Sequence, residues 1–317
     1  MKRQLRLALV HLEVRYKDLE TNRKNILRWN LEAALQGADV ILNTEMPLAG
    51  YSFLSREDIA GYVEPDTGET VVELARIARE YGKYIGIGLA ERDEATGIYY
   101  NSAVMIGPNG KPVCKHRKIS SEMRWACPGR PTQKSTFETP WGRMGVLICS
   151  DTYYGLLPRS LALKGVDLLW VPANWPPGGL DPKELWKARV LENGFFLAAC
   201  GRSGKDRIMD CREAVSCVYD AEGRELFSSS SSESAVFLVD LPLDDKGKLH
   251  GLSRRRKLKT RTPPHYSPIY LDLRLVDDLT GHYGLPEAGP LHVHCIVPGN
   301  NSATAESLEK RIKEQGG

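Results

Sequence analysis

Apolar residues follow two spacing patterns over the first 240 positions of the chain. Short, nearly continuous apolar runs have the length of β-strands. Between them lie longer stretches in which apolar residues recur every three or four positions, as on one face of a helix. The strand-like runs are 5–12, 38–43, 84–88, 102–106, 145–149, 167–172, 195–200, 216–219 and 235–239. The helix-like stretches are 18–35, 71–81, 156–164 and 182–193.

This alternation of strands and helices predicts an α/β fold. Apolar runs without alternating polar residues are typical of strands in sheets that are covered on both faces. Runs 84–88 and 102–106 are joined by a short polar connection and predict a hairpin, so the sheets should be mixed rather than purely parallel. The serine-rich stretch 228–232 is expected to form an exposed turn between strands.

Composition narrows the class of protein. The 317 residues are 42% hydrophobic and 26% charged, which is ordinary for a soluble globular protein. The 43 basic and 40 acidic residues give a net charge of +3, so neither nucleic acid nor an acidic membrane is expected as a partner. No apolar run approaches the roughly 18 residues that a membrane span needs.

Cysteine usage bears on the compartment. The seven cysteines are scattered and include no C-x-x-C pair, which fits a reducing environment better than a disulfide framework. The apolar run near the N-terminus is interrupted by His11, Glu13 and Arg15, which predicts a strand rather than a secretion signal. We therefore expect a soluble, cytoplasmic protein.

Three residues capable of chemistry lie where predicted strands end and loops begin. Glu45 follows run 38–43, Lys118 follows a strand-and-turn region, and Cys149 closes run 145–149. A cysteine can act as a nucleophile when a carboxylate takes its proton and an ammonium group stabilises the thiolate and an oxyanion. Of the seven histidines only His116 lies near these segments, which weakens a Cys–His pair. Taken alone, Cys149 has the position of an inert core residue.

The order and context of these three residues change that interpretation. Glu45, Lys118 and Cys149 lie in segments that resemble the three catalytic motifs of the nitrilase superfamily of carbon–nitrogen hydrolases. The resemblance runs from about residue 4 to residue 266. The motif-bearing segments are ADVILNTEMPLAGY (38–51), KHRKISSE (115–122) and GRMGVLICSDTYY (142–154). The supporting segments are GVDLLWVPANWP (165–176), WKARVLENGFFLAACGRSG (186–204), SCVYDAEGREL (216–226) and RRRKLKTRTPPHY (254–266).

The resemblance implies an architecture and an assembly. It implies a four-layer α-β-β-α sandwich of two mixed sheets, with the hydrolase domain over residues 1–266. Residues 267–317 would then be a C-terminal extension that can wrap a neighbouring subunit. Members of the family pair through helices near the active site, so a homodimer or a higher even oligomer is expected. Neither a metal nor an organic cofactor is expected.

The resemblance also implies roles for the residues. Glu45 would be the general base, Cys149 the nucleophile that forms a thioester, and Lys118 the group that stabilises the oxyanion together with the backbone N–H of Ser150. A second carboxylate assists in some branches. Glu122 is the candidate for it, although it stands closer to Lys118 than expected, and Glu138 is the alternative.

The residues around the nucleophile bear on the substrate. True nitrilases usually carry Cys-Trp-Glu, whereas this chain has Cys149-Ser150-Asp151, which resembles the amidase and N-carbamoyl hydrolase branches. A small-molecule amide or N-carbamoyl substrate is therefore favoured over a nitrile. The residues expected at or near the pocket are Asn174, Trp175, Tyr51, Trp125 and Tyr153, and each aromatic residue among them could equally be a packing or dimer contact. Arg124, Arg130 and Arg202 are left without an assigned role.

Several alternatives stay open at this point. The protein could be a nitrilase, a non-catalytic regulatory relative, or a glutaminase unit that supplies ammonia to a partner synthetase. His292 and His294 share one face of a predicted strand, but two histidines without further ligands are more often structural. The basic cluster 254–261 is expected to be a solvated face or a subunit contact, and Cys127 a packed or loop residue.

Overall fold

The computed structural model describes residues 4–130, 132–249, 258–259 and 261. The chain divides into two compact units, Met1–Thr260 and Arg261–Gly317, and every described helix and strand belongs to the first. The extension expected over 267–317, His292 and His294, and most of the basic cluster lie outside the described residues. Within the described residues, no helix combines the length and apolar character that a bilayer crossing requires.

Twelve strands form two sheets of six within the described residues. The first sheet has the order β12-β1-β2-β3-β4-β5 and the second the order β11-β10-β9-β8-β7-β6. The strands of the first sheet are β1 (Gln4–His11), β2 (Val40–Asn43), β3 (Tyr84–Arg92), β4 (Tyr99–Ile106), β5 (Pro112–Arg117) and β12 (Ala235–Pro242). Those of the second are β6 (Thr136–Thr139), β7 (Gly142–Val146), β8 (Leu168–Pro172), β9 (Phe196–Cys200), β10 (Ser216–Tyr219) and β11 (Glu225–Ser229).

Both sheets are mixed, as the sequence predicts. In the first, β1, β2 and β3 are parallel and the other neighbours are antiparallel. The second repeats this pattern, with β7, β8 and β9 parallel. The expected hairpin is confirmed, because β3 and β4 pair antiparallel from Ile85↔Ile106 to Arg92↔Tyr99. The ends of β2, β7 and β8 carry candidate site residues, as is usual for parallel strands in α/β proteins.

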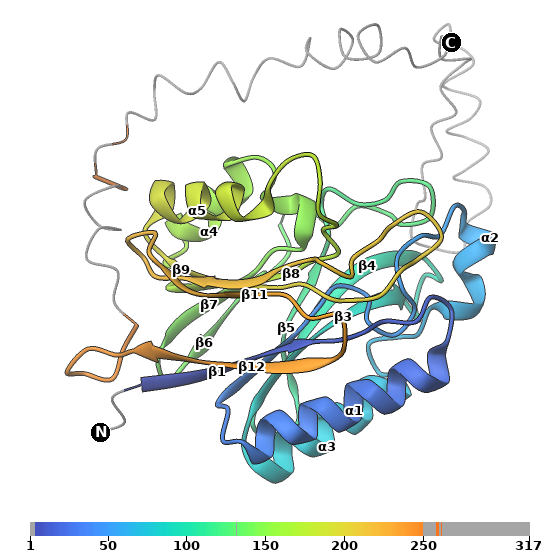
Figure 1. Ribbon diagram of the computed structural model, residues 1–317, viewed down its shortest axis with the longest axis horizontal. Coiled ribbons are helices and arrows are strands. Elements are labelled where there is room, and N and C mark those ends of the chain that lie inside the picture. Colours follow the sequence, from blue (N-terminus) through green and yellow to red (C-terminus); the bar gives the residue numbers. More distant parts are fainter. Residues whose placement is uncertain (1–3, 131, 250–257, 260, 262–317) are drawn as a thin grey trace, which may run out of the picture. The chain divides into compact units, whose positions relative to one another are not determined.

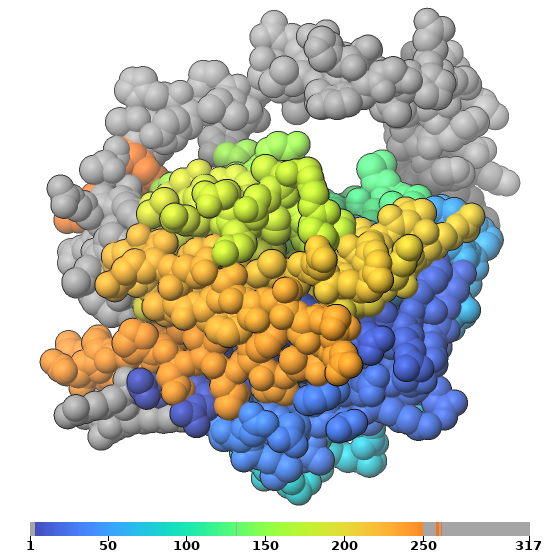
Figure 2. Space-filling model, viewed as in Figure 1, coloured from blue at the N-terminus to red at the C-terminus, as the bar shows by residue number. Residues whose placement is uncertain are grey.

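Helices cover both outer faces, which completes the predicted four-layer α-β-β-α sandwich. Figure 1 shows α4 and α5 along one side, α1 and α3 along the other, and the strands between them. The space-filling view shows the same order, with the yellow-green α4–α5 region and the blue α1 region on opposite sides of yellow and orange strands (Figure 2). The helices are α1 (Leu19–Leu35), α2 (Arg56–Ile59), α3 (Glu69–Tyr81), α4 (Leu156–Leu163) and α5 (Pro182–Asn193).

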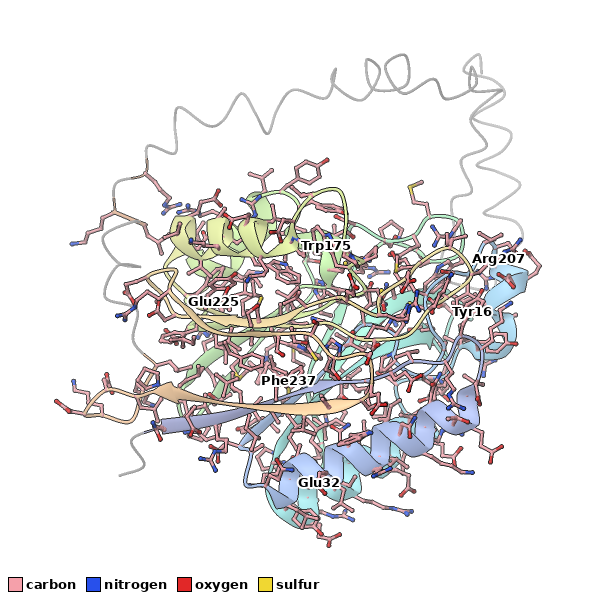
Figure 3. The ribbon with its side chains drawn as sticks, viewed as in Figure 1. Tyr16, Glu32, Trp175, Arg207, Glu225 and Phe237 are labelled. Atoms are coloured by element: carbon pink, nitrogen blue, oxygen red, sulfur yellow. The ribbon has the colours of Figure 1, made fainter. Side chains whose placement is uncertain are left out.

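The main core lies between the two sheets. Trp170 of β8 is fully buried, and its indole N–H donates to the carbonyl of Asn43 at the end of β2, 3.2 Å away. Phe237 of β12 and Phe227 of β11 bring the sheets together elsewhere, with ring centroids 5.1 Å apart. Figure 3 labels Phe237 between the layers and Glu32 on α1 at the outer side. Burial of large apolar side chains between the sheets is the main stabilising term of such a fold.

The helices that flank the site begin and end at residues suited to those positions. The side chain of Asp18 accepts a hydrogen bond from the Thr21 N–H and caps α1. Asp181 caps α5 in the same way, and Pro182 stands in the first turn, where its missing N–H costs nothing. Helix α5 ends at Gly194 in the left-handed conformation, with φ +69°.

Two expectations about local structure are wrong. Strand β7 ends at Val146, so Cys149 does not close a strand but begins a 3₁₀ turn, Cys149–Thr152. The turn expected over the serine-rich stretch 228–232 begins later than expected, because Ser228 and Ser229 still belong to β11. Short or alternating segments without a long apolar run are not recognised from the sequence. They are α2, the 3₁₀ helix Ala60–Tyr62, β5, β6 and β11.

Candidate active site

The segments that follow three strands bring the predicted triad into one buried cluster. Glu45 follows β2, Lys118 follows β5, and Cys149 follows β7. The Lys118 ammonium lies 2.7 Å from Glu45 Oε1, and both side chains are completely buried. Residues more than 70 positions apart in the chain therefore meet in an ion pair that water does not reach. Buried charges are tolerated only where they are paired and hydrogen-bonded in this way.

Glu122 joins this cluster on the other side of the lysine. Lys118 Nζ also donates to Glu122 Oε1, and so does the Tyr51 hydroxyl. Asn101 of β4 joins the two carboxylates, because its Nδ2 donates to Glu45 Oε1 at 2.7 Å and to Glu122 Oε2 at 3.0 Å. The alternative, Glu138, lies on β6 with its side chain 67% exposed and paired with Arg143. Of the two carboxylates, the structure brings only Glu122 to the triad.

The two carboxylates differ in their electrostatic surroundings. Burial raises the pKa of Glu45, and the nearby charge of Glu122 adds to the rise, which the attraction of Lys118 only partly offsets. Burial acts to raise the pKa of Glu122 as well, but Lys118 and hydrogen bonds from Lys118 and Tyr51 outweigh it, so that this pKa is lowered. One carboxylate is thus prepared to accept a proton and the other to stay ionised.

Lys118 remains a cation in this setting. Burial acts to lower the pKa of Lys118, but the negative charges of Glu45 and Glu122 outweigh it and hold the pKa well above its ordinary value. A lysine that keeps its charge can stabilise an oxyanion throughout a reaction.

The end of β8 fixes the orientation of Glu45. The backbone N–H of Asn174 donates to Glu45 Oε2 at 2.8 Å, and the Asn174 side chain donates to the Glu45 carbonyl at 2.9 Å. Gly88 of β3 lies directly against this segment. A Cβ at position 88 would stand 2.5 Å from the Thr44 carbonyl oxygen and 2.9 Å from Glu45 Cα. The close approach of β3 to the end of β2 therefore requires a glycine.

Cys149 occupies a strained position at the start of its 3₁₀ turn. Its φ is +43°, a left-handed conformation that a cysteine rarely adopts. The side chain is buried, and Sγ lies 3.9 Å from the Asn174 carbonyl oxygen. Burial raises the pKa of the thiol well above its ordinary value, and the charge of Glu45 adds to the rise. The resting residue is therefore a thiol that needs a base to become a nucleophile.

A cavity of about 290 Å³ opens at Cys149. Four of the five residues that the sequence places at or near the pocket line this cavity, namely Tyr51, Tyr153, Asn174 and Trp175. Ser150, expected to take part through its backbone N–H, lines it as well. Trp175 also packs edge-on against Tyr153, with ring centroids 4.9 Å apart, and Figure 3 labels it on the α4–α5 side. Trp125, in contrast, is buried in a separate cluster with Met46 and Phe53 and does not line the cavity.

The three unassigned arginines do not line the cavity either. Arg202 is fully buried, donates to the Asn174 side-chain oxygen, and pairs with Asp206 at 2.8 Å. It supports the segment that orients Glu45 rather than offering a free cation to a substrate. Arg124 donates to the Phe53 carbonyl, and Arg130 is exposed.

Comparison with known proteins decides the family. A family model described as carbon–nitrogen hydrolase matches residues 6–258. The chain belongs to the carbon–nitrogen hydrolase family. The resemblance read from the three motifs is thereby confirmed, and the protein is an enzyme of the class that acts on non-peptide C–N bonds. The roles of the individual residues are taken up as proposals below.

Curated relatives of this carbon–nitrogen hydrolase carry three kinds of name. It is 29% identical over 257 residues to the nitrilase of Pyrococcus abyssi, covering 78% of this chain and 95% of the relative. It is 29% identical over 248 residues to the mouse omega-amidase NIT2, covering 73% of this chain and 87% of the relative. It is 28% identical over 262 residues to the N-carbamoylputrescine amidase of Solanum lycopersicum, covering 74% of this chain and 85% of the relative.

Solved structures support the same fold. The chain superposes on an amidase from Nesterenkonia sp. AN1 with a TM-score of 0.70 at 22% identity, covering 83% of this chain and 99% of the other. A variant of the Nesterenkonia amidase was solved with the acetamide moiety of fluoroacetamide covalently added at its active-site cysteine. At this level of identity the likeness shows that the two chains share a fold.

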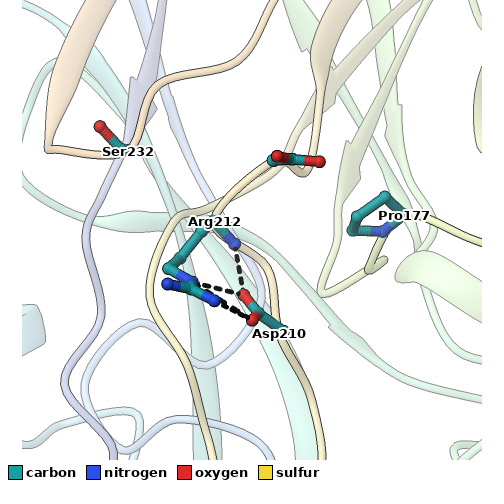
Figure 4. A pocket seen from close by; sticks show the side chains of 5 residues that line it. Pro177, Asp210, Arg212 and Ser232 are labelled. Carbon is teal, nitrogen blue, oxygen red and sulfur yellow. Dashed lines mark hydrogen bonds and ion pairs between the residues drawn. The ribbon is translucent and has the colours of Figure 1, made fainter.

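A second hollow of about 510 Å³ lies outside the catalytic cluster. Pro177, Asp210, Arg212, Glu213 and Ser232 line it (Figure 4). Arg212 is engaged by Asp210, with Nε–Oδ1 2.9 Å and Nη2–Oδ2 2.6 Å, so its guanidinium is already satisfied. Within the described residues, no cluster of three or more histidine, cysteine, aspartate or glutamate side chains has a geometry that could hold a metal ion.

Proposed function

We propose that this hydrolase is a thiol amidohydrolase that cleaves the C–N bond of a small linear amide or N-carbamoyl compound through a thioester on Cys149. The observation that carries the proposal is the buried Glu45–Lys118–Glu122 cluster beside Cys149 at the base of a small cavity. These groups supply a base, a cation and a nucleophile, which are the three functions that acyl transfer through cysteine requires.

The first half of the reaction forms the thioester. Glu45 takes the proton of the Cys149 thiol, and the sulfur attacks the carbonyl carbon while the carbonyl π-electrons move to oxygen. Lys118 and the backbone N–H of Ser150 stabilise the resulting oxyanion. The oxyanion then collapses, the C–N bond breaks, and the leaving nitrogen receives the proton that Glu45 holds. Ammonia or an amine departs, and the acyl group remains on sulfur.

The second half releases the acid. Glu45, ionised again, takes a proton from a water molecule that attacks the thioester carbonyl, and the C–S bond breaks as the sulfur recovers that proton. Glu45 is therefore the base in both halves, in agreement with its raised pKa. Glu122 stays ionised beside Lys118, and we propose that it keeps the ammonium charged and pointing at the reacting oxygen.

The lining of the cavity favours a short substrate without a charge. Aromatic, aliphatic and amide side chains supply most of the surface, and the lining residues that the structure describes include no arginine, lysine, aspartate or glutamate. A ligand carboxylate would lose its hydration there without gaining a cation. The Cys149-Ser150-Asp151 run and the amidases among the relatives support an amide or N-carbamoyl group at the reacting end.

A nitrilase is the second candidate, because the relative from Pyrococcus abyssi carries that name at 29% identity. The same cysteine and lysine would serve a nitrile, with a thioimidate in place of the tetrahedral intermediate of an amide. The two candidates differ in their products: a nitrilase releases an acid and ammonia from a nitrile, whereas an amidohydrolase leaves the nitrile intact.

Ammonia release from a matched panel tests the proposal. The panel contains short aliphatic and aromatic amides, the corresponding N-carbamoyl amines, and the corresponding nitriles, with the Cys149→Ala variant as the control. We expect ammonia from at least one amide or N-carbamoyl compound with the wild-type enzyme and none with the variant. Ammonia from nitriles alone would replace the proposal with a nitrilase, and full activity of the variant would overturn the role of Cys149.

We also propose where the protein is located and how it assembles. The six cysteines in the described residues are free thiols, which supports the proposed cytoplasmic location. Exposed apolar side chains on α4 and α5, among them Leu163 and Leu191, support pairing of two copies into a homodimer or a higher even oligomer.

A further inference from the structure

One carboxylate outside the triad joins the two segments that carry Lys118 and Cys149. Asp151 stands in the 3₁₀ turn that begins at Cys149, and it is almost fully buried. Its Oδ1 accepts the backbone N–H groups of Ile119 at 2.9 Å and Ser120 at 2.8 Å, the two residues that follow Lys118. Its Oδ2 accepts the backbone N–H of Ile148 at 3.1 Å, directly before Cys149.

His116 supplies the fourth hydrogen bond to the same carboxylate. Its Nε2 lies 2.7 Å from Asp151 Oδ2, and its Nδ1 lies 2.8 Å from the Ser135 hydroxyl. With the proton on Nε2, the ring donates to Asp151 and accepts from Ser135. Asp151 thus receives donors from both sides of Lys118 and from the residue before the nucleophile. A carboxylate that accepts four hydrogen bonds has little freedom to move.

The serine, histidine and aspartate of this chain have the residue types of a hydrolytic triad, but their burial excludes that use. His116 is 0%, Asp151 1% and Ser135 5% exposed, and none of the three lines the cavity at Cys149. No substrate carbonyl can reach the Ser135 hydroxyl. The arrangement therefore acts on the neighbouring segments rather than on a substrate.

The geometry points to a positioning role: we propose that Asp151 and His116 set the position of the Lys118 ammonium relative to Cys149 Sγ, and so control the rate of the chemical steps. The inference rests on the proposed function of Lys118 and Cys149. The Ser150 hydroxyl, which donates to the Ser120 carbonyl at 3.0 Å, adds a second link between the same two segments. A displacement of about 1 Å between reacting groups can cost about 100-fold in rate.

A positioning role for Asp151 and His116 predicts different effects on kcat and on KM. Cys149, Ser150 and Tyr153 line the pocket from the turn that contains Asp151 or from directly beside it. The other side chains that shape the pocket, among them Tyr51, Asn174 and Trp175, come from separate segments and make no hydrogen bond to Asp151, so a loosened link should leave KM nearly unchanged. Lys118 would still lie between Glu45 and Glu122, but its ammonium would no longer be held at the distance from Cys149 that the reaction needs. The change should therefore appear in kcat.

The test compares three variants by steady-state kinetics on the best substrate of the panel. Asp151→Asn removes the charge and one acceptor oxygen at constant shape, and His116→Leu removes the donor. His116→Gln keeps an N–H donor and is the rescue variant. We expect kcat to fall about 100-fold in Asp151→Asn and His116→Leu, with KM within about threefold of wild type, and to recover at least tenfold in His116→Gln relative to His116→Leu.

Asp220→Asn is the matched control. Asp220 is buried to the same degree and accepts the backbone N–H groups of Glu222 and Arg224 at 3.0 and 2.9 Å, but in a turn outside the catalytic cluster. It should lower the melting temperature without lowering kcat. If Asp151→Asn and Asp220→Asn behave alike, with unchanged kcat in the folded fraction, the positioning role is wrong.

Alkylation of Cys149 by iodoacetamide, followed by peptide mass mapping, gives a readout that does not depend on turnover. We expect Asp151→Asn to slow alkylation of Cys149 at least tenfold, while the exposed Cys127 of the same molecule reacts at its wild-type rate. An unchanged rate at Cys149 overturns the proposal. A slowed rate in an enzyme that turns over no compound of the panel would instead keep the positioning role and contradict the proposed substrate class.

Discussion

Two glutamates lie against the same lysine, yet their surroundings shift their pKa values in opposite directions. Glu45 is fully buried and has its pKa raised, whereas Glu122 receives donors from Lys118, Tyr51 and Asn101 and has its pKa lowered. This difference supports the proposed role of Glu45 as the base. The family resemblance already implies that role, with Glu122 as the candidate second carboxylate. The opposite pKa shifts could not be read from the sequence, because the burial and the hydrogen-bond partners come from distant segments.

The raised pKa of Glu45 predicts the acid limb of the pH profile. Glu45 must be ionised to take the thiol proton, so kcat/KM should rise with pH through the Glu45 pKa, at a midpoint above the ordinary carboxyl range of about 4 to 4.5. The pKa of Cys149 and that of Lys118 are held above their ordinary values, so neither group should produce a basic limb near neutral pH. A profile of kcat/KM between about pH 3 and pH 9 measures this, and a midpoint at or below the ordinary carboxyl range would contradict it.

Glu122→Gln should move that acid limb in a defined direction. The negative charge of Glu122 is one cause of the raised pKa of Glu45, so its removal should shift the midpoint of the residual activity to lower pH. Because the amide no longer holds the Lys118 ammonium as an ion pair, kcat should also fall, by about 100-fold. The profile is measured on the same substrate as the wild type. An upward shift would contradict this coupling, and loss of the acid limb would show that Glu122, not Glu45, titrates in it.

Among single elements, the contacts of the segment after β2 with β3 and with the segment after β8 determine the orientation of Glu45.

Strand β2 and the apolar part of β3 can be predicted from the sequence as apolar runs, and helices α1, α4 and α5 can be predicted from their periodicity. Strands β5, β6 and β11 are not, because they are short and mix exposed with buried positions. The 3₁₀ turn at Cys149 is missed for another reason: Asp151 in this turn accepts hydrogen bonds from His116, Ile119 and Ser120, which are distant in the sequence and which no local propensity reveals.

Gly88→Ala tests the contact between β3 and the end of β2. The added Cβ would stand 2.5 Å from the Thr44 carbonyl oxygen, so the segment bearing Glu45 must shift. We expect a loss of about 1–3 kcal/mol in the free energy of unfolding and a drop in kcat of about tenfold or more. Gly61→Ala is the control, because a Cβ at position 61 meets no atom within 4 Å. Chemical denaturation and kinetics of both variants measure the difference, and equal behaviour would refute the packing argument.

In the molecule as a whole, the helical layer formed by α4 and α5 carries exposed apolar side chains. Leu163 of α4 is 49% exposed and Leu191 of α5 is 45% exposed, and Tyr154 just before α4 is 73% exposed. The four-layer order could be predicted only through the family resemblance, because strand and helix periodicity does not say which strands share a sheet. That residues 267–317 wrap a neighbouring subunit stays a prediction.

Light scattering coupled to size exclusion tests the assembly. The wild-type chain should elute with the mass of a dimer or of a higher even oligomer, and the double variant Leu163→Glu/Leu191→Glu should shift toward lower mass, because two charges would be buried in the interface. Leu35→Glu is the control, since Leu35 is 62% exposed at the end of α1, in the opposite helical layer. A monomeric wild type, or equal masses for all three proteins, would contradict the proposed pairing.

During turnover, Cys149 is proposed to carry the acyl group. The test is intact-mass spectrometry of the wild type, of Glu45→Gln and of the control Cys149→Ser, each quenched in acid after mixing with the best amide of the panel. We expect a mass increase equal to the acyl group in the wild type, mapped to the peptide that contains Cys149. We expect a smaller increase or none in Glu45→Gln, which lacks the base for the thiol, and none in Cys149→Ser. Ammonia release by Cys149→Ser at the wild-type rate, or an acyl group mapped to any other residue, would contradict the proposed role of Cys149.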